Sequence, residues 1–288
     1  MNTNQNFHQA QKPRPYVVSV TSGKGGVGKT LTTVNLAIAA RKMGRSVLIF
    51  DGDLGLANVD VVLGLQPRYN IRDVLDGNAR LKDIVMEGPL GIRVIPSGSG
   101  ISSLAQLSFV QRQQLMEQIE TLDIPVDILL IDTGAGISEN VLHLNSGADR
   151  VIVVTSAEPH AMTDAYAIIK VLAEEHQRKQ FDLLVNQVRS TEEGLRVSDR
   201  IKEVAKRFLD IDVGFLGAVP YDPQIQKSIM QRRAASEQSA HTLAGQAWNR
   251  IARSVFSHSD VQVLEGDVQD MWQNLICSPP VTALGSTF

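Results

Sequence analysis

The sequence is nearly devoid of cysteine. Its 288 residues include one cysteine, Cys277. The chain can therefore form no intramolecular disulfide and can supply no cysteine cluster for zinc or an iron–sulfur centre. Such scarcity is typical of proteins from a reducing compartment.

Long apolar runs and a strong net charge are missing as well. No stretch reaches the ~18 apolar residues that span a bilayer, and the polar segment 1–15 lacks the apolar core of a signal peptide. We therefore expect a cytoplasmic protein. A net charge of −3 does not favour a chain that coats nucleic acid through bulk charge, so we do not expect nonspecific DNA binding.

Short continuous apolar runs recur along the chain, and helical patterns separate most of them. Continuous rather than alternating apolar character is typical of strands that are covered on both faces. This order predicts an α/β fold with a mostly parallel, doubly wound sheet and helices on both faces. The predicted strands lie at residues 16–20, 47–50, 92–95, 127–131, 151–155, 182–185 and 213–219.

Composition divides the chain into three parts. Residues 1–15 are rich in asparagine and glutamine and contain Pro13 and Pro15, which predicts a flexible arm. Residues 16–256 form the predicted α/β domain. Residues 257–288 form an acidic tail that has neither lysine nor arginine.

An amphipathic helix is predicted within the tail, at about 263–276. Its apolar face could insert into a membrane, or it could dock on the protein's own core or on a partner. Because the tail offers no cation to anionic lipid, charge does not favour the membrane. A second apolar face, around Trp248 and Phe256, is predicted to pack in the core. The predicted apolar positions of the tail helix are Leu264, Val268, Met271, Trp272 and Leu275.

The most informative stretch is Gly-Lys-Gly-Gly-Val-Gly-Lys-Thr at residues 23–30, between the strand at 16–20 and a helical pattern at 31–43. It matches G-x-x-x-x-G-K-[ST], whose backbone N–H groups surround phosphate oxygens at the positive end of a helix. Lys29 is predicted to bridge the β- and γ-phosphates, and the Thr30 hydroxyl to hold Mg²⁺. The predicted nucleotide contacts of this segment are Gly25, Gly26, Val27, Gly28, Lys29, Thr30 and Thr33.

Carboxylates follow two of the predicted strands. Parallel sheets bind ligands at the carboxyl ends of their strands, so Asp51, Asp53 and Asp132 should face the phosphate loop. Asp132 is predicted to hold Mg²⁺ through water. Asp51 and Asp53 share a face, so that one could order the Mg²⁺ waters and the other the attacking water. The amide of Gly134 could sense a γ-phosphate. Helix or turn capping is the alternative for each aspartate.

Lys24, inside the phosphate loop, resembles the second, signature lysine of the deviant Walker A loop in the MinD/ParA family of P-loop ATPases. The resemblance implies ATP or ADP with Mg²⁺ as cofactors and a homodimer that sandwiches two ATP molecules. In such a dimer Lys24 reaches the partner's phosphates, and a monomer hydrolyses ATP slowly.

Within that family the chain is most similar to the FlhG/FleN group of flagellar-number regulators, through residues 51–65, 69–75, 95–101 and 158–166. The resemblance covers residues 16–256. It implies Asp53 as the water-positioning residue, Asp51 and Asp132 around Mg²⁺, and Gly134 as the switch amide. Further nucleotide contacts implied by the family are Asn186, Pro220 and Asp222 near the adenine and Glu158 near the partner's nucleotide.

The implied output is control of the number or placement of flagella through an FlhF-type GTPase, the flagellar switch ring or a FleQ-like transcriptional activator. His8 and Pro13 depart from the group's GTPase-activating helix, whereas Gln9, Ala10 and Arg14 fit it. The group's terminal helix implies peripheral membrane contact in the ATP-bound state. The alternatives are a MinD-type division-site ATPase, a ParA-type DNA- or cargo-positioning ATPase, or a scaffold with an inactive site.

Overall fold

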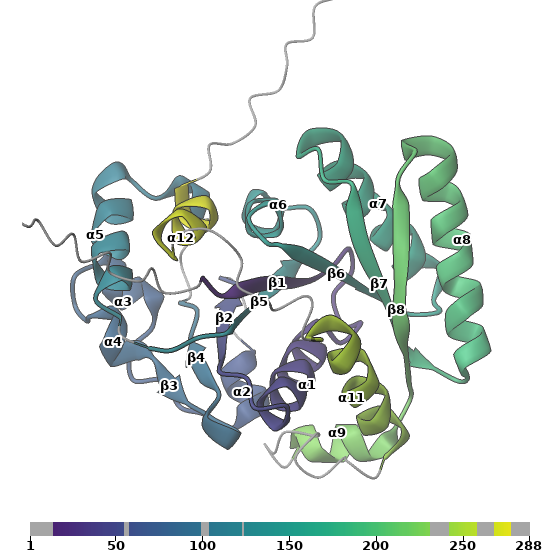
Figure 1. Ribbon diagram of the computed structural model, residues 1–288, viewed down its shortest axis with the longest axis horizontal. Coiled ribbons are helices and arrows are strands. Elements are labelled where there is room, and N and C mark those ends of the chain that lie inside the picture. Colours follow the sequence, from purple (N-terminus) through teal and green to yellow (C-terminus); the bar gives the residue numbers. More distant parts are fainter. Residues whose placement is uncertain are drawn as a thin grey trace, which may run out of the picture.

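A computed structural model describes residues 14–54, 58–98, 104–122, 124–230, 242–257 and 268–277. Its centre is an eight-stranded sheet with the order β3-β4-β2-β5-β1-β6-β7-β8 (Figure 1). Every pair of neighbouring strands is parallel except β3 and β4. The strands are β1 Tyr16–Ser22, β2 Val47–Gly52, β3 Met86–Glu87, β4 Arg93–Ile95, β5 Ile128–Ala135, β6 Arg150–Thr155, β7 Gln180–Val188 and β8 Asp212–Pro220.

Helices cover both faces of this sheet, which confirms the predicted doubly wound α/β fold. Helices α1, α2, α9 and α11 contribute to the core on one face, and α3 to α8 with α12 contribute to the core on the other. None of the described helices is both long and apolar enough to cross a bilayer. The helices are α1 Lys29–Lys42, α2 Val59–Leu63, α3 Ile71–Leu75, α4 Leu81–Ile84, α5 Phe109–Glu120, α6 Glu139–Ser146, α7 Pro159–Glu175, α8 Thr191–Leu209, α9 Pro223–Met230, α11 Leu243–Val255 and α12 Val268–Cys277, with short 3₁₀ turns η1 Pro89–Gly91 and η2 Leu104–Gln106.

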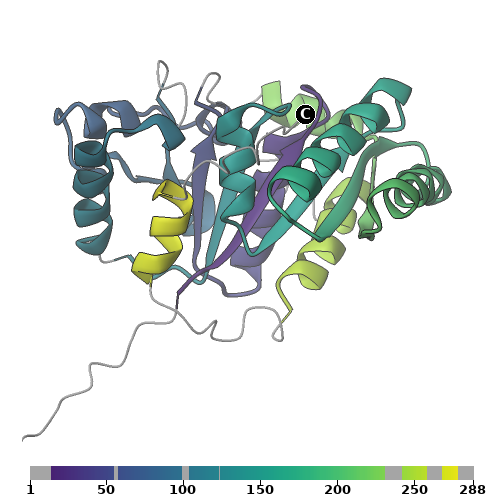
Figure 2. The ribbon, with the colours of Figure 1, turned by 90° about the horizontal axis from the view of Figure 1, so that it is seen from above.

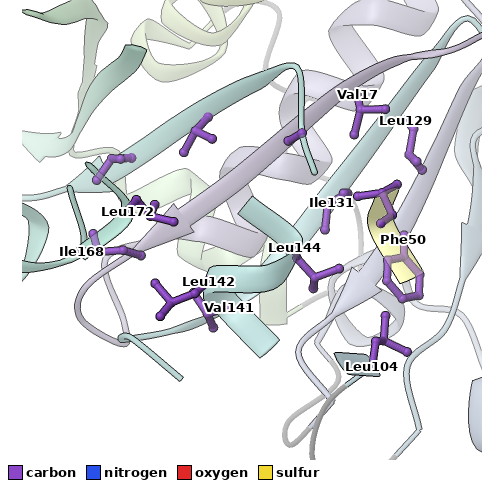
Figure 3. Packing of buried hydrophobic residues seen from close by; sticks show 14 of the residues in the cluster. Val17, Phe50, Leu104, Leu129, Ile131, Val141, Leu142, Leu144, Ile168 and Leu172 are labelled. Atoms are coloured by element: carbon purple, nitrogen blue, oxygen red, sulfur yellow. The ribbon is translucent and has the colours of Figure 1, made fainter. Parts of the chain in front are cut away.

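The continuous apolar runs are explained by this double coverage. Neighbouring residues of a strand point to opposite faces, and here both faces are buried. Val17 of β1 packs with the core on the α6 side, whereas Val18 packs with the core on the α1 side, and neither is exposed. Figure 3 shows the first of these cores, where Leu142 of α6 and Leu172 of α7 cover the sheet.

Strand β1 lies at the centre of the sheet, between β5 and β6. The chain continues from β1 to β2 on one side of it, whereas β6, β7 and β8 lie on the other side. A sheet of this kind has its crevice outside the carboxyl ends of the strands where the order reverses. The phosphate loop leaves β1 at this edge. The register places Asp51 of β2 opposite Asp132 of β5 at the same edge.

The described residues of both predicted C-terminal apolar faces are buried. Trp248 on α11 and Phe256 just after it lie in the core as expected. Of the helix predicted at about 263–276, α12 is described from Val268, and residues 263–267 lie outside the described residues. Figures 1 and 2 show α12 beside α5 and away from α11.

The apolar face of α12 packs on the protein's own core, which is the docked alternative of the prediction. Met271, Trp272, Leu275 and Ile276 are all buried there. Trp272, Leu275 and Ile276 line a small apolar space together with residues of α5, α6 and η2. A hydrogen bond of 2.8 Å joins His143 Nε2 on α6 to the carbonyl oxygen of Leu275. Burial lowers the pKa of His143, so the neutral ring donates this bond.

We predict that Trp272→Ala destabilises the protein by about 3 kcal/mol, because truncation of a buried tryptophan loses its transfer free energy and leaves a cavity. Urea denaturation would measure the change. The neighbouring Gln273 is exposed, so Gln273→Ala should stay within about 0.5 kcal/mol of wild type. Equal midpoints for the two variants would show that α12 does not pack on the core.

Candidate functional site

The phosphate loop joins β1 to α1 and needs glycine at its last position. Gly28 precedes α1 with φ of +95°, a conformation that L side chains rarely adopt. A β-carbon at this position would also collide with Nδ2 of Asn186. That amide, from β7, donates a hydrogen bond of 2.9 Å to the carbonyl oxygen of Val27. The buried Asn186 therefore holds the loop in shape, and its predicted adenine contact stays a prediction.

Lys29 begins α1 with its side chain buried among acids. The residue is only 8% exposed. Burial lowers the pKa of its ammonium group, while the carboxylates of Asp132 and Asp53 act to raise it. An ammonium group in such a place is positioned for the phosphates of a nucleotide held by the loop.

Asp132, at the carboxyl end of β5, is tied to α1 by two hydroxyl groups. Thr33 donates a hydrogen bond of 2.9 Å to its Oδ1, and the side chain of Thr30 is a second partner. Burial nevertheless raises the pKa of Asp132 to about 6. Thr33, which was predicted among the nucleotide contacts, thus bonds to Asp132 instead. Thr30, predicted to hold Mg²⁺, bonds to the same carboxylate, so the two residues predicted at the metal lie together.

Asp51 fits both roles considered for it, which are helix capping and a place beside the predicted Mg²⁺ site. Its carboxylate accepts backbone hydrogen bonds from Asp53 N at 3.2 Å, Asn58 N at 3.2 Å and Val59 N at 3.3 Å, so it caps the start of α2. It also lies opposite Asp132 in the sheet. Burial, and then the charge of Asp132, raise the pKa of Asp51 to about 8, although the three backbone donors act to lower it.

The donors near the loop fit a magnesium–nucleotide complex better than a metal cage made of protein alone. The described residues contain no cluster of three or more histidine, cysteine or acidic side chains that could hold a metal ion. Mg²⁺ usually keeps several waters and binds one or two carboxylates together with substrate phosphates. Asp132, Asp51 and the hydroxyl of Thr30 supply that kind of donor set.

Asp53, predicted to position the attacking water, lies beside Gly134, whose amide was predicted to sense the γ-phosphate. Asp53 Oδ1 lies 3.6 Å from the position that a β-carbon on Gly134 would take. The turn after Gly134 is linked to the loop, because Gly136 N donates a hydrogen bond of 2.9 Å to Ser22 O. The predicted switch residues 55–57 lie outside the described residues.

Lys24 and Glu158, both predicted to act at a partner's nucleotide, are paired within the chain. Lys24 Nζ lies 2.6 Å from Glu158 Oε2, just before α7, and the two side chains are 38% and 66% exposed. The lysine lowers the pKa of Glu158. Exposed ion pairs contribute little to stability, so Lys24 can exchange this partner for another anion.

The residues predicted to close over the base stand at the same edge of the sheet. Pro220 ends β8. Asp222 Oδ1 accepts a hydrogen bond of 2.9 Å from Gln224 N at the start of α9. Tyr221 N donates to Val188 O of β7 at 2.9 Å. Their part in base binding stays a prediction.

Sequence reasoning missed three buried side chains that hold the site. Asn140 and Ser97 donate to the carbonyl oxygens of Gly52 and Asp53, each at 2.9 Å. Thr133 lies 2.9 Å from the hydroxyl of Thr21 on β1. Each is a polar residue in a segment that resembles a solvated surface, so the sequence held no strong signal for it.

We predict that the nucleotide-free protein loses thermal stability as the pH rises from about 5 to about 8. Asp51 and Asp132 have pKa values of about 8 and about 6 in the folded protein, against an ordinary value of 3.8. These two carboxyls therefore hold more protons in the folded state than in the unfolded state in this range, so raising the pH favours unfolding. The lowered pKa values of His143 and His176 oppose this effect only near pH 6. Tm measured in buffer without Mg²⁺ would show the slope.

Asp51→Asn is the matching variant. It should remove most of the slope between pH 6 and pH 8 and roughly halve it near pH 5, where the contribution of Asp132 remains. A wild-type Tm that is flat or rises over this range would contradict the prediction.

Comparison with known proteins agrees with this geometry. Residues 18–234 match the family model described as the CobQ/CobB/MinD/ParA nucleotide binding domain. The chain is 40% identical over 241 residues to the antiactivator FleN of Pseudomonas aeruginosa, covering 84% of this chain and 86% of FleN. It is 32% identical to the flagellum site-determining protein YlxH of Helicobacter pylori, covering 86% and 84% of the two chains.

A solved structure shows the same fold with nucleotide. The septum site-determining protein MinD of Pyrococcus horikoshii, complexed with Mg-ADP, superposes with a TM-score of 0.68 at 26% identity. The match covers 85% of this chain and 97% of that one. By its sequence, its fold and its phosphate loop, the chain belongs to the CobQ/CobB/MinD/ParA family of nucleotide-binding domains.

Proposed function

We propose that this protein is a Mg²⁺-dependent ATPase that acts as a switch controlling the number or placement of flagella. The observation that carries the ATPase part is the contact between the buried Lys29 and the buried Asp132 beside the phosphate loop, with the half-buried Asp53 close to both. The similarity to FleN and to the flagellum site-determining protein YlxH supports the flagellar output.

Each residue of the site has a part in this proposal. The loop amides and the Lys29 ammonium group bind and orient the phosphates. Thr30, Asp132 and Asp51 hold Mg²⁺ and its waters, and the ion supplies positive charge to the phosphate oxygens when it is bound. Asp53 orients the attacking water at the end of β2.

The proposal includes a dimer that sandwiches ATP. Lys24 is half exposed and carries a weak pair with Glu158, so it is free to move to the phosphates of a second copy. A cation that arrives from the partner stabilises transition-state charge only in the dimer, which makes the lone subunit slow. ATP would then favour the dimer, and hydrolysis would release it.

We predict that Asp53→Ala traps the dimer. The variant should bind ATP through the intact loop and hydrolyse it only at a small residual rate, so light scattering coupled to gel filtration should show a stable dimer with ATP and Mg²⁺. The same variant with ADP should stay a monomer. If Asp53→Ala remains a monomer at saturating ATP and Mg²⁺, the sandwich mechanism does not operate in this protein.

The partner in this proposal is a transcriptional activator resembling FleQ, an FlhF-type GTPase or the flagellar switch ring. The name of FleN as an antiactivator supports the first of these. Arg14, the last match to the GTPase-activating helix, makes two hydrogen bonds of 2.9 and 2.8 Å with Asp149 of its own chain. This pairing does not favour direct action of Arg14 on a GTPase, and residues 1–13 lie outside the described residues.

We place the protein in the cytoplasm, and its contact with a membrane depends on α12. The apolar face of this helix is buried in the core. Peripheral binding to the inner face of the membrane would require α12 to leave that position, because the same side chains would have to enter the lipid.

A flagellar count tests the biological output. We predict that deleting the gene in its source bacterium alters flagellar number or placement, as seen by electron microscopy. Wild type should restore the pattern, and Lys29→Ala should not. Lys42→Ala, at the other end of α1, is the matched control and should restore it. Normal flagella in the deletion strain would instead favour a division-site or DNA-segregation function for the same switch.

A further inference from the structure

The peptide group between Gly52 and Asp53 lies between two carboxylates of the proposed site, Asp51 and Asp53, and it is held at both ends. This group consists of the carbonyl of Gly52 and the N–H of Asp53. The carbonyl accepts a hydrogen bond of 2.9 Å from Asn140 Nδ2 on α6. The N–H donates to Asp51 Oδ1 at 3.2 Å. With both ends bonded, the peptide plane cannot rotate without breaking a buried hydrogen bond.

The orientation of this peptide decides where the carboxylate of Asp53 points. The Cα of Asp53 follows directly after this peptide plane, and its Cβ direction is fixed once the peptide planes on both sides of that Cα are held. On its far side, the carbonyl of Asp53 accepts a hydrogen bond of 2.9 Å from Ser97 Oγ. Asn140 therefore supplies one of the bonds that fix the backbone on both sides of Asp53.

The amide of Asn140 has only one orientation that satisfies its neighbours. Its Oδ1 accepts a hydrogen bond of 3.2 Å from Leu104 N, and Leu104 begins η2. Because an oxygen is needed on that side, the NH₂ group must face Gly52. Asn140 is almost fully buried, so water cannot replace either bond.

Packing presses α6 against the same peptide. Leu144 lies one turn after Asn140, and its Cδ1 lies 2.6 Å from the position that a β-carbon on residue 52 would occupy. Only glycine permits this approach. Figure 3 shows Leu144 beside Phe50 at this end of β2. The helix thus brings a polar and an apolar contact, four residues apart on one face, to the turn between Asp51 and Asp53.

We propose that Asn140 is a positioning residue for ATP hydrolysis. It holds the Gly52–Asp53 peptide so that the carboxylate of Asp53 stays beside Gly134, and it touches neither nucleotide nor metal itself. This inference rests on the ATPase function proposed above. Because the phosphate loop and Lys29 do not depend on this bond, loss of Asn140 should slow hydrolysis and leave nucleotide binding in place.

The test compares Asn140→Leu with Asn145→Leu. Asn145 lies on the same helix and is equally buried, but its Nδ2 donates to Val141 O at 2.7 Å and its Oδ1 accepts from Ser19 Oγ at 2.8 Å. Both variants lose two buried hydrogen bonds without adding charge, so both should lower Tm to a similar extent. Asn140→Ser, which is smaller, is a second variant in case leucine prevents folding.

We expect Asn140→Leu to lower kcat about ten- to a hundredfold, as a misplaced catalytic group does. Its KM for ATP and its Kd for a non-hydrolysable ATP analogue should stay within about threefold of wild type. Asn145→Leu should keep kcat within about twofold. Equal losses of kcat in the two variants, an unchanged kcat in Asn140→Leu, or a rise in KM alone would overturn the proposal.

A double-variant comparison separates an effect on the position of Asp53 from a general disturbance of the folded structure. If Asn140 acts through Asp53, adding Asn140→Leu to Asp53→Ala should lower kcat no further. A further drop of about tenfold would show that Asn140 acts by another route. Wild type that binds ATP and does not hydrolyse it would refute the proposed ATPase function, and the role of Asn140 with it.

Discussion

The buried contact between α1 and the end of β5 is the constraint on which the rest of the site depends. Lys29 and Thr33 of α1 meet Asp132 of β5 where water is excluded. A buried lysine or carboxylate is costly alone, and each becomes tolerable beside the other. This contact fixes α1 against the centre of the sheet, so the loop between β1 and α1 has both of its ends anchored.

From this anchor the sheet register determines what else reaches the loop. Asp51 lies opposite Asp132 because β2 and β5 pair in parallel. The segment that follows Asp51 is then held by α6 and by the strand end at Ser97. The chemistry of the site therefore comes from four separate parts of the chain, and the parallel sheet brings their carboxyl ends to one edge.

Much of the fold could be predicted from the sequence because the sheet is covered on both sides. Strands such as β5 begin as unbroken apolar runs, and the run ends where the site begins. The short β3 strand, Met86–Glu87, has no run long enough to give a signal. The phosphate loop and the three aspartates were also predictable, because each stands at or just after the end of an apolar run that predicts a strand.

The supports of the site were not predictable, since they depend on contacts between distant residues. Asn186 holds a loop that lies 159 positions earlier in the chain, and Glu158 meets Lys24 across 134 positions. No local sequence pattern indicates a contact between residues that lie so far apart in the chain. The docking of α12 had the same difficulty, because an apolar helix face shows that it must be buried and does not show against what.

The position of α12 has a consequence for the order in which the protein can mature. Phe50, Leu115 and Leu144 belong to parts of the chain that leave the ribosome early, yet their common surface is closed by Trp272 and Leu275. Until the segment from Val268 to Cys277 has been synthesised, the nascent chain holds all of its described strand segments and lacks the helix that covers this apolar surface. Exposed apolar surface of this kind attracts chaperones and other nascent chains, and α12 is the described helix that closes it.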